Sequence, residues 1–257
     1  MKAGLLQQIE RWYSIPLLLL AWQVAVSSGL VESRLLPGLG RVAAALIHDT
    51  GNGVLPYHTA VTLGRAAAGF ALAALAGVPF AAAMARSTLM RNLFEPIFFF
   101  GYPVPKIALF PVFTYVFGIG SPSKVAFAFL ECLYPIVVTA YLGFRAIPVR
   151  LIWSAENMGA PRLTIVTRVI VPAAMPGIFN GLRIALPIAI IVIVLTEMIG
   201  DSRGLGYYIA ISGTRFEFAN VYAAILVIGA CGFVLDRALL RLRRAVVHWE
   251  RDAERTR

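Results

Sequence analysis

The chain has 257 residues, of which 59% are hydrophobic and only 14% are charged. Because a soluble domain carries about a quarter charged residues on its water-facing surface, this composition excludes an ordinary soluble protein and predicts a membrane protein. The net charge of +10 does not indicate nucleic-acid binding, because the arginines lie between apolar runs and form no basic face with interleaved aromatic residues.

Six apolar runs are long enough to cross a membrane, since an α-helix needs roughly 20 residues to span the hydrocarbon core. Backbone groups find no water in lipid, so each run is predicted to be helical. The expected fold class is an all-α polytopic membrane protein with six transmembrane helices. The predicted spans cover residues 14–30, 59–85, 93–117, 124–144, 173–199 and 219–240.

The first run shows no small-residue cleavage site, so we interpret it as a retained helix rather than a signal peptide. In the connection that follows, Leu39 to His48 has helical periodicity with charges on one side, which is typical of a helix lying on the membrane surface. The second span is rich in Ala and Gly, so we expect it to pack centrally.

The third run contains Pro103, Pro105 and Pro111, which predict a break near Tyr102 to Pro105 because proline removes a backbone donor. Tyr102 is a candidate for lining a substrate pathway, although aromatic residues in such helices more often pack or anchor at the interface, and the same holds for Phe98 to Phe100. Lys106 either offers positive charge to a substrate or extends to the interface.

Glu131 lies within the fourth span, where a charge is costly unless it faces a cavity or a partner. It is either a pathway residue, or part of a structural pair, or a protonated and hydrogen-bonded carboxyl. An unpaired carboxylate would oppose the passage of an anion. Glu197, at the end of the fifth span, is a second pathway candidate, with a structural role at the following loop (200–208) as the alternative. For Arg183 we expect a structural or paired role.

No pattern points to catalysis. A phosphate-binding GxxxxGK[ST] motif is absent, so the chain is not expected to hydrolyse ATP or to be an enzyme. The three histidines do not have metal-ligand spacing, and Cys132 and Cys231 are interpreted as buried structural thiols.

Arginine and lysine counts predict the orientation. Fifteen lie in the N-terminal segment, the second-to-third and fourth-to-fifth loops and the C-terminal tail, against five in the opposite connections. The positive-inside bias therefore places both termini and the loop between the fourth and fifth spans in the cytoplasm.

That loop contains a short amphipathic helix. Pro148 stands where a helix begins, and Leu151, Ile152, Ala155 and Met158 recur at helical spacing before Gly159 and Pro161 end it. Such a helix either rests on the lipid surface or docks into a groove of a soluble partner.

The loop resembles the signature of ABC importer permeases, in which EAA is followed after three residues by Gly and after nine more by I-x-L-P. Gly159 is followed by nine residues and then by Val169-Ile170-Val171-Pro172. The alanine pair becomes Ser154-Ala155, and Trp153 replaces the leading glutamate. Within this group, the chain most resembles the nitrate, sulfonate and taurine permeases. Five short strings carry that resemblance: PVPKIAL (103–109), FGIG (117–120), PGIFNGLRIAL (176–186), EMI (197–199) and GLGY (204–207).

The resemblance implies a type I ABC importer permease fold with a cytoplasmic coupling helix that contacts an ATPase subunit. It implies a bacterial inner-membrane location and, as partners, a second permease copy, two ATPase subunits, an extracytoplasmic substrate-binding protein and membrane lipid. ATP and Mg²⁺ belong to the ATPase, and no cofactor is expected on this chain. The implied coupling residues are Trp153, Ser154, Ala155, Glu156, Met158, Gly159, Ala160 and Pro161.

The predicted organisation is an N-terminal helix and periplasmic connection (1–58), a permease transmembrane domain (59–242) and a charged cytoplasmic tail (243–257). Two other classes remain as alternatives. An ion-coupled secondary transporter is expected to show discontinuous helices in two related halves. A membrane-embedded enzyme is expected to cluster His, Asp or Glu at one depth.

Overall fold

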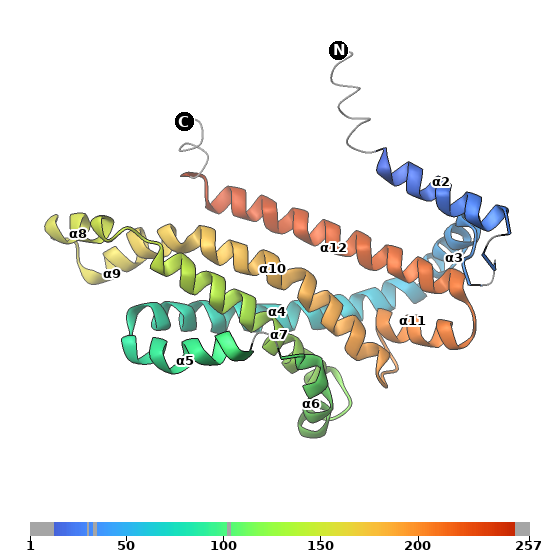
Figure 1. The fold of residues 1–257 in the computed structure, drawn as a ribbon, viewed down its shortest axis with the longest axis horizontal. Helices are drawn as coiled ribbons and strands as arrows, with labels where there is room; N and C mark the ends of the chain where they lie inside the picture. Colours follow the sequence, from blue (N-terminus) through green and yellow to red (C-terminus); the bar gives the residue numbers. More distant parts are fainter. Residues whose placement is uncertain (1–12, 30, 33–34, 102–103, 250–257) are drawn as a thin grey trace, which may run out of the picture.

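The computed structural model describes residues 13–29, 31–32, 35–101 and 104–249 (Figure 1). All regular structure in these ranges is helical, which confirms the all-α fold class. The helices are α2 (Ser14–Ser27), α3 (Leu39–Gly51), α4 (Val54–Arg86), α5 (Thr88–Gly101), α6 (Phe110–Phe117), α7 (Ser121–Arg145), α8 (Val149–Asn157), α9 (Arg162–Ile165), α10 (Val171–Met198), α11 (Leu205–Thr214) and α12 (Phe218–Val246). A 3-10 helix, η1 (Lys106–Leu109), precedes α6, and a π-helix, η2 (Val166–Ile170), precedes α10.

Four helical segments in the described ranges are long and apolar enough to cross a membrane: α4, α7, α12 and the continuous segment Arg162–Met198 that ends in α10. They coincide with the second, fourth, fifth and sixth predicted spans. The first predicted span differs, because its described part, α2, is a shorter apolar helix of 14 residues.

The third predicted span is not one helix. Its helix α5 ends at Gly101, and η1 begins at Lys106 after Pro105. The chain is therefore interrupted in the region where the prolines predict a break, because proline cannot donate the backbone hydrogen bond that would continue the helix. Tyr102 and Pro103 lie outside the described residues.

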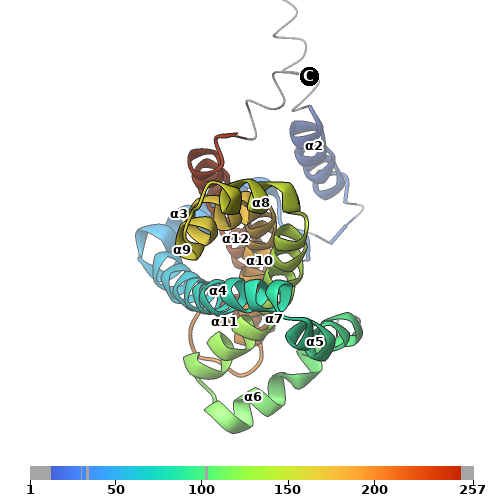
Figure 2. The same cartoon turned by 90° about the vertical axis from the view of Figure 1, so that its left-hand side faces the viewer.

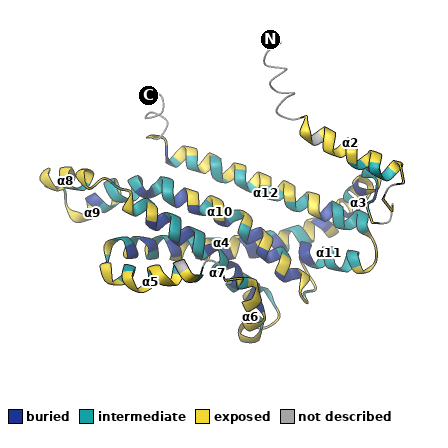
Figure 3. Ribbon diagram, viewed as in Figure 1, coloured by how far each residue is buried: buried dark blue, intermediate teal, exposed yellow. Residues whose placement is uncertain are grey.

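Buried residues concentrate along α4, α7 and α10 (Figure 3). Glycines allow this close packing. A Cβ atom on Gly177 of α10 would lie 2.6 Å from Gly143 Cα of α7, and one on Gly69 of α4 would lie 2.7 Å from Ala128 Cβ of α7. The predicted central packing of the second span is thus confirmed, since small residues let these helix backbones approach.

A second group of helices packs at one end of the molecule. The predicted helix from Leu39 is present as α3, and its Asp49 accepts a hydrogen bond from the Tyr208 hydroxyl of α11. Burial and this hydrogen bond raise the pKa of Tyr208 above its ordinary value. In turn, α2 is tied to the segment before α3 through Trp22 Nε1, which donates to the Pro37 carbonyl at 3.0 Å.

The loop predicted over residues 200–208 is too long. Helix α11 begins at Leu205, directly after Gly204, whose φ is +105°. Along the long axis of the molecule, α8 and α9 lie at one end and α3 and α11 at the other (Figure 1). Viewed from the first end, α8 and α9 lie together in front of α10 and α12 (Figure 2).

Candidate functional site

The amphipathic segment between the fourth and fifth spans forms α8. Pro148, with extended backbone, precedes its first turn, and the chain reverses at Gly159, where φ is +72°. The Gly159 amide donates to the Glu156 carbonyl and the Ala160 amide donates to the Ala155 carbonyl, which closes the helix end. Glycine suits this position because other residues rarely adopt positive φ.

The apolar face of α8 is only partly buried against the chain itself. Ala155 is buried and Ile152 is half-buried, whereas Leu151, Trp153 and Met158 are exposed. Of the other predicted coupling residues, Ala160 is half-buried, and the remaining four are exposed: Ser154, Glu156, Gly159 and Pro161. The end of the molecule that carries α8 therefore presents large apolar side chains without a covering element among the described residues.

A continuous backbone connects this end to the fifth span. After Pro161, the chain runs through α9 and η2 directly into α10, so that residues Arg162–Met198 form one helical segment. The Gly159-to-Pro172 spacing therefore corresponds to a reversal, a short helix and a π-helix. A continuous helical segment of this kind can transmit a displacement of α8 to the end of the span.

Two of the predicted pathway residues lie together. Lys106 of η1 and Glu131 of α7 approach to 3.7 Å between Nζ and Oε2, with side chains 13% and 16% exposed. The Lys106 ammonium also lies 4.5 Å from the ring centroid of Tyr134, a residue that sequence reasoning did not select. Glu131 is therefore paired, as one alternative expected. Tyr102, the third candidate, lies outside the described residues.

Glu197, the fourth candidate, lies at the opposite end of the fold from α8 and is fully buried. Its carboxylate accepts hydrogen bonds from Thr62 at 2.7 Å, from Arg65 Nη1 at 2.8 Å and from the Gly206 amide at 3.1 Å. This geometry supports the structural alternative, in which Glu197 holds the following glycine-containing loop. Its assignment to the pathway stays a prediction.

Glu197 belongs to a buried ion cluster that sequence reasoning did not assemble. Arg65 also donates to Asp201 at 2.8 Å, and Lys124 Nζ lies 3.0 Å from the same carboxylate. Burial alone would raise the pKa of Asp201, but hydrogen bonds and charge from Lys124, with the Ser202 amide and Arg65, lower it below its ordinary value. The sequence offers one signal for this cluster. Arg65, Lys124 and Glu197 each lie near the end of a predicted span that faces away from the cytoplasm.

The close approach at this cluster explains the Gly-Leu-Gly string. A Cβ atom on Gly206 would lie 2.0 Å from the Val194 carbonyl oxygen, and one on Gly204 would lie 2.1 Å from the Glu197 carboxyl carbon. The Gly204 amide donates to His58 Nδ1 at 3.0 Å.

Elsewhere, Arg183 pairs with Asp236 at 3.0 Å, which agrees with the paired role expected for it.

Comparison with known proteins identifies a family over most of the chain. The family described as "Binding-protein-dependent transport system inner membrane component" matches residues 69–248. The matched range includes α7, α8, α10 and α12.

Among similar proteins, the taurine transport system permease protein TauC of Escherichia coli (strain K12) is 30% identical, with 94% of this chain and 90% of that protein covered. The formylaminopyrimidine transport permease protein ThiX of Halalkalibacterium halodurans is 27% identical, with 95% of this chain and 97% of that protein covered. A Bacillus subtilis (strain 168) permease protein assigned by name to aliphatic sulfonates transport is 27% identical, covering 93% of this chain and 87% of that protein.

A solved structure titled as an inward-facing conformation of the MetNI methionine ABC transporter has a similar chain. It superposes with a TM-score of 0.63 at 20% identity and covers 72% of this chain and 93% of that chain. This likeness shows that the two chains share a fold.

Proposed function

The chain belongs to the family of binding-protein-dependent transport system inner membrane components, and we propose that it is the membrane-spanning subunit of an ATP-driven importer. The proposed cargo is a small solute of the nitrate, sulfonate or taurine type, or a related small molecule, delivered by an extracytoplasmic binding protein. The names of the relatives for taurine and aliphatic sulfonates transport support this class.

The observation that carries the proposal is the form of α8. It is a short helix with exposed apolar residues at one end of the molecule, ended by Gly159 in the left-handed conformation and joined through one helical segment to α10. A helix that docks into a groove of a soluble partner needs such an exposed apolar face. We therefore assign α8 as the helix that contacts the ATPase.

In the proposed mechanism, two copies of the chain form a homodimer around a central pathway, and each α8 contacts one of two ATPase subunits. Those subunits would hold ATP and Mg²⁺, and the hydrolysis of ATP there would supply the free energy of the cycle. On this chain, α8 moves with the ATPase, and α9, η2 and α10 transmit the displacement to the spans. The arginine and lysine bias supports a cytoplasmic location for α8 and for both termini in a bacterial inner membrane.

For the pathway, we propose the interrupted segment between α5 and α6, with Lys106 and Glu131. An interrupted helix at membrane depth is tolerated where it is covered by protein or lines a water-filled cavity. Because Lys106 compensates the Glu131 carboxylate at 3.7 Å, the pair presents no net negative charge that would oppose an anionic cargo.

The experiment that tests the function is uptake by a complex purified through this chain. The full chain, expressed with its ATPase and binding protein and placed in liposomes, is expected to accumulate labelled taurine, an alkanesulfonate or nitrate only when ATP is present. Uptake that follows an imposed ion gradient and proceeds without ATP would instead support a secondary transporter.

The pathway assignment has a separate test in the same liposomes. Glu131→Gln removes the negative partner of Lys106 and leaves a net positive charge, so we expect it to change the KM for uptake at least severalfold without loss of complex assembly. An unchanged KM in an assembled complex would mean that the Lys106–Glu131 pair is structural.

A further inference from the structure

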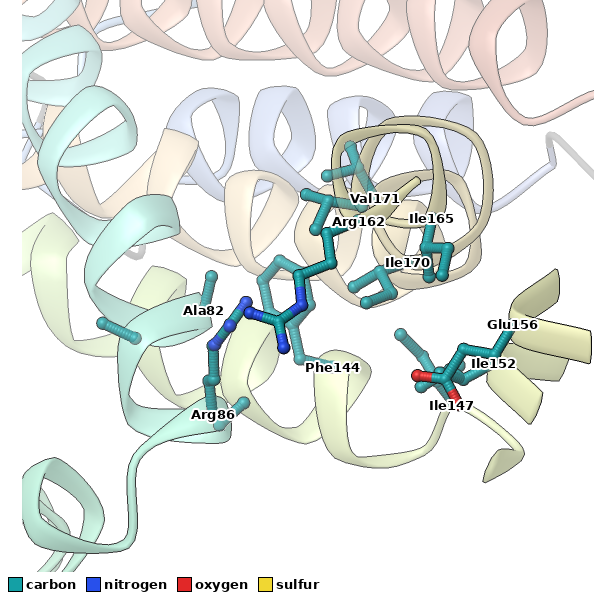
Figure 4. Close-up of a pocket in the computed structure, with 13 residues that line it drawn as sticks. Ala82, Arg86, Phe144, Ile147, Ile152, Glu156, Arg162, Ile165, Ile170 and Val171 are labelled. Carbon is teal, nitrogen blue, oxygen red and sulfur yellow. The ribbon is translucent and has the colours of Figure 1, made fainter. Parts of the chain in front are cut away.

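A pocket of about 610 Å³ lies between the ends of α4 and α7 on one side and α8, α9 and η2 on the other (Figure 4). Three charged residues line it: Arg86 from the last turn of α4, Arg162 from the first turn of α9, and Glu156 from α8. All of its other lining residues are Ala, Val, Ile or Phe. We call this cavity the α4–α8 pocket.

The two arginine side chains converge in the α4–α8 pocket. Figure 4 shows the Arg86 and Arg162 side chains pointing toward one another, whereas the Glu156 carboxylate lies on the other side of the cavity. No hydrogen bond or ion pair joins the side chain of either arginine to another residue in ranges 13–29, 31–32, 35–101 and 104–249. By contrast, Arg65 and Arg183 each pair with a carboxylate.

Both arginines are exposed, and neither side chain has a carboxylate partner among the described residues, so both guanidinium groups are available to an anion that enters the pocket. Their convergence therefore indicates a site for an anion. The planar fork of N–H donors on each arginine matches the oxygens of a phosphate group, which two arginines can hold from two sides.

The apolar walls narrow the class of ligand. A free inorganic anion would leave the Ala, Ile and Phe side chains of the pocket in contact with water, whereas a ligand with a hydrocarbon portion would cover them. Basic pockets between helices at a membrane surface are suited to the headgroups of anionic lipids. Arg86 is the last residue of α4, a helix long and apolar enough to cross a membrane, and the end of such a helix is where headgroups are expected.

We propose that the α4–α8 pocket binds an anionic phospholipid, with the headgroup phosphate held between Arg86 and Arg162. The bound lipid would join the ends of α4 and α7 to α8, α9 and the π-helix η2. Because a π-helix is a local irregularity that often occurs at functional sites, occupation of the pocket would fix the position of α8 relative to the spans. The lipid would thereby favour the arrangement in which α8 contacts its partner.

This inference rests on the proposed function only in that the chain lies in a membrane, and it does not depend on transport. Its test therefore measures lipid binding alone. The full chain in mild detergent is titrated with phosphatidylglycerol and with phosphatidylcholine of the same acyl chains, and bound lipid is counted by native mass spectrometry. We expect preferential retention of phosphatidylglycerol. Arg86→Gln and Arg162→Gln should each weaken this retention roughly fivefold, and the double variant more than tenfold.

Two further variants make the result specific. Arg150→Gln removes an exposed arginine of α8 that does not line the pocket, and it should leave the retention unchanged. Glu156→Gln removes the acidic group of the pocket lining and should increase phosphatidylglycerol retention, a gain that misfolding cannot produce.

Three outcomes would overturn the proposal. Equal phosphatidylglycerol retention by the double variant and the unmodified chain would mean that the arginines do not hold the lipid. Displacement of the lipid by millimolar inorganic phosphate, with no dependence on acyl chains, would indicate a site for a free anion. Loss of the lipid whenever the ATPase is assembled would indicate that an acidic group of that partner occupies the site.

Discussion

Arg65 joins two parts of the fold that are far apart in sequence. It lies on α4, is 4% exposed, and donates to Glu197 and to Asp201, which are 132 and 136 positions away. With Lys124, the cluster contains two positive and two negative groups in a region that excludes water. Breaking one partner of a buried ion pair costs more than the pair contributes, because it leaves the other charge uncompensated.

We therefore predict that Arg65→Met destabilises the protein by about 3–5 kcal/mol, because Glu197 loses its compensating charge. For a chain of this length, that corresponds to a decrease of at least about 6 °C in the thermal unfolding midpoint, measured on the purified chain in detergent. Arg183→Met is the matched control, since the Arg183–Asp236 pair is half-exposed and is expected to contribute less than about 1 kcal/mol. Equal shifts for the two variants would contradict a structural role for the cluster.

At the scale of elements, the long spans could be predicted because their apolar residues and their length are local properties. The break before Lys106 could also be predicted, because the effect of Pro103 and Pro105 on the backbone is local. Helix α8 was predictable for the same reason: Pro148, the helical spacing of its apolar residues and Gly159 all lie within a dozen positions.

Helix α11 could not be predicted in this way. Its first amides are satisfied by side chains from distant elements: the Leu205 amide donates to Thr62 Oγ1 at 2.8 Å, and the Gly206 amide donates to Glu197. A helix start usually requires a local acceptor for these amides, and the two glycines at positions 204 and 206 favour a loop. The tertiary contacts outweigh that local preference.

The packing of α7 on α10 leads to an element-scale prediction. A Cβ atom at Gly177 would lie 2.6 Å from Gly143 Cα and 3.0 Å from the Thr139 carbonyl oxygen, so the two backbones must separate. Gly177→Ala should lower stability by about 1–3 kcal/mol, measured by thermal unfolding in detergent. Gly64→Ala on α4 is the control, because a Cβ atom there meets nothing within 4 Å, and it should leave the unfolding midpoint unchanged or slightly raised. A midpoint for Gly177→Ala at or above that of the unmodified chain would show that the contact is not close.

At the scale of the whole molecule, the ion cluster and α8 lie at opposite ends of the long axis (Figure 1). Between them lies the bundle of α4, α7 and α10, whose glycine contacts make it a close-packed unit. A displacement at α8 therefore has a continuous packed route to the other end. The family and the fold could be predicted from the order of short strings along the sequence, whereas the Lys106–Glu131 pairing and the cluster around Arg65 depend on tertiary contacts and required the structure.

The assignment of α8 as the contact to the ATPase is the central claim, and a photo-crosslinking experiment tests it most directly. A photoreactive amino acid replaces Met158, which is 79% exposed beside α8, or Tyr115, which is 95% exposed on α6 away from α8. In a complex purified through this chain, illumination is expected to join position 158, but not position 115, to the ATPase subunit. An ATPase that co-purifies without a crosslink from position 158, or with equal yields from both positions, would contradict the assignment.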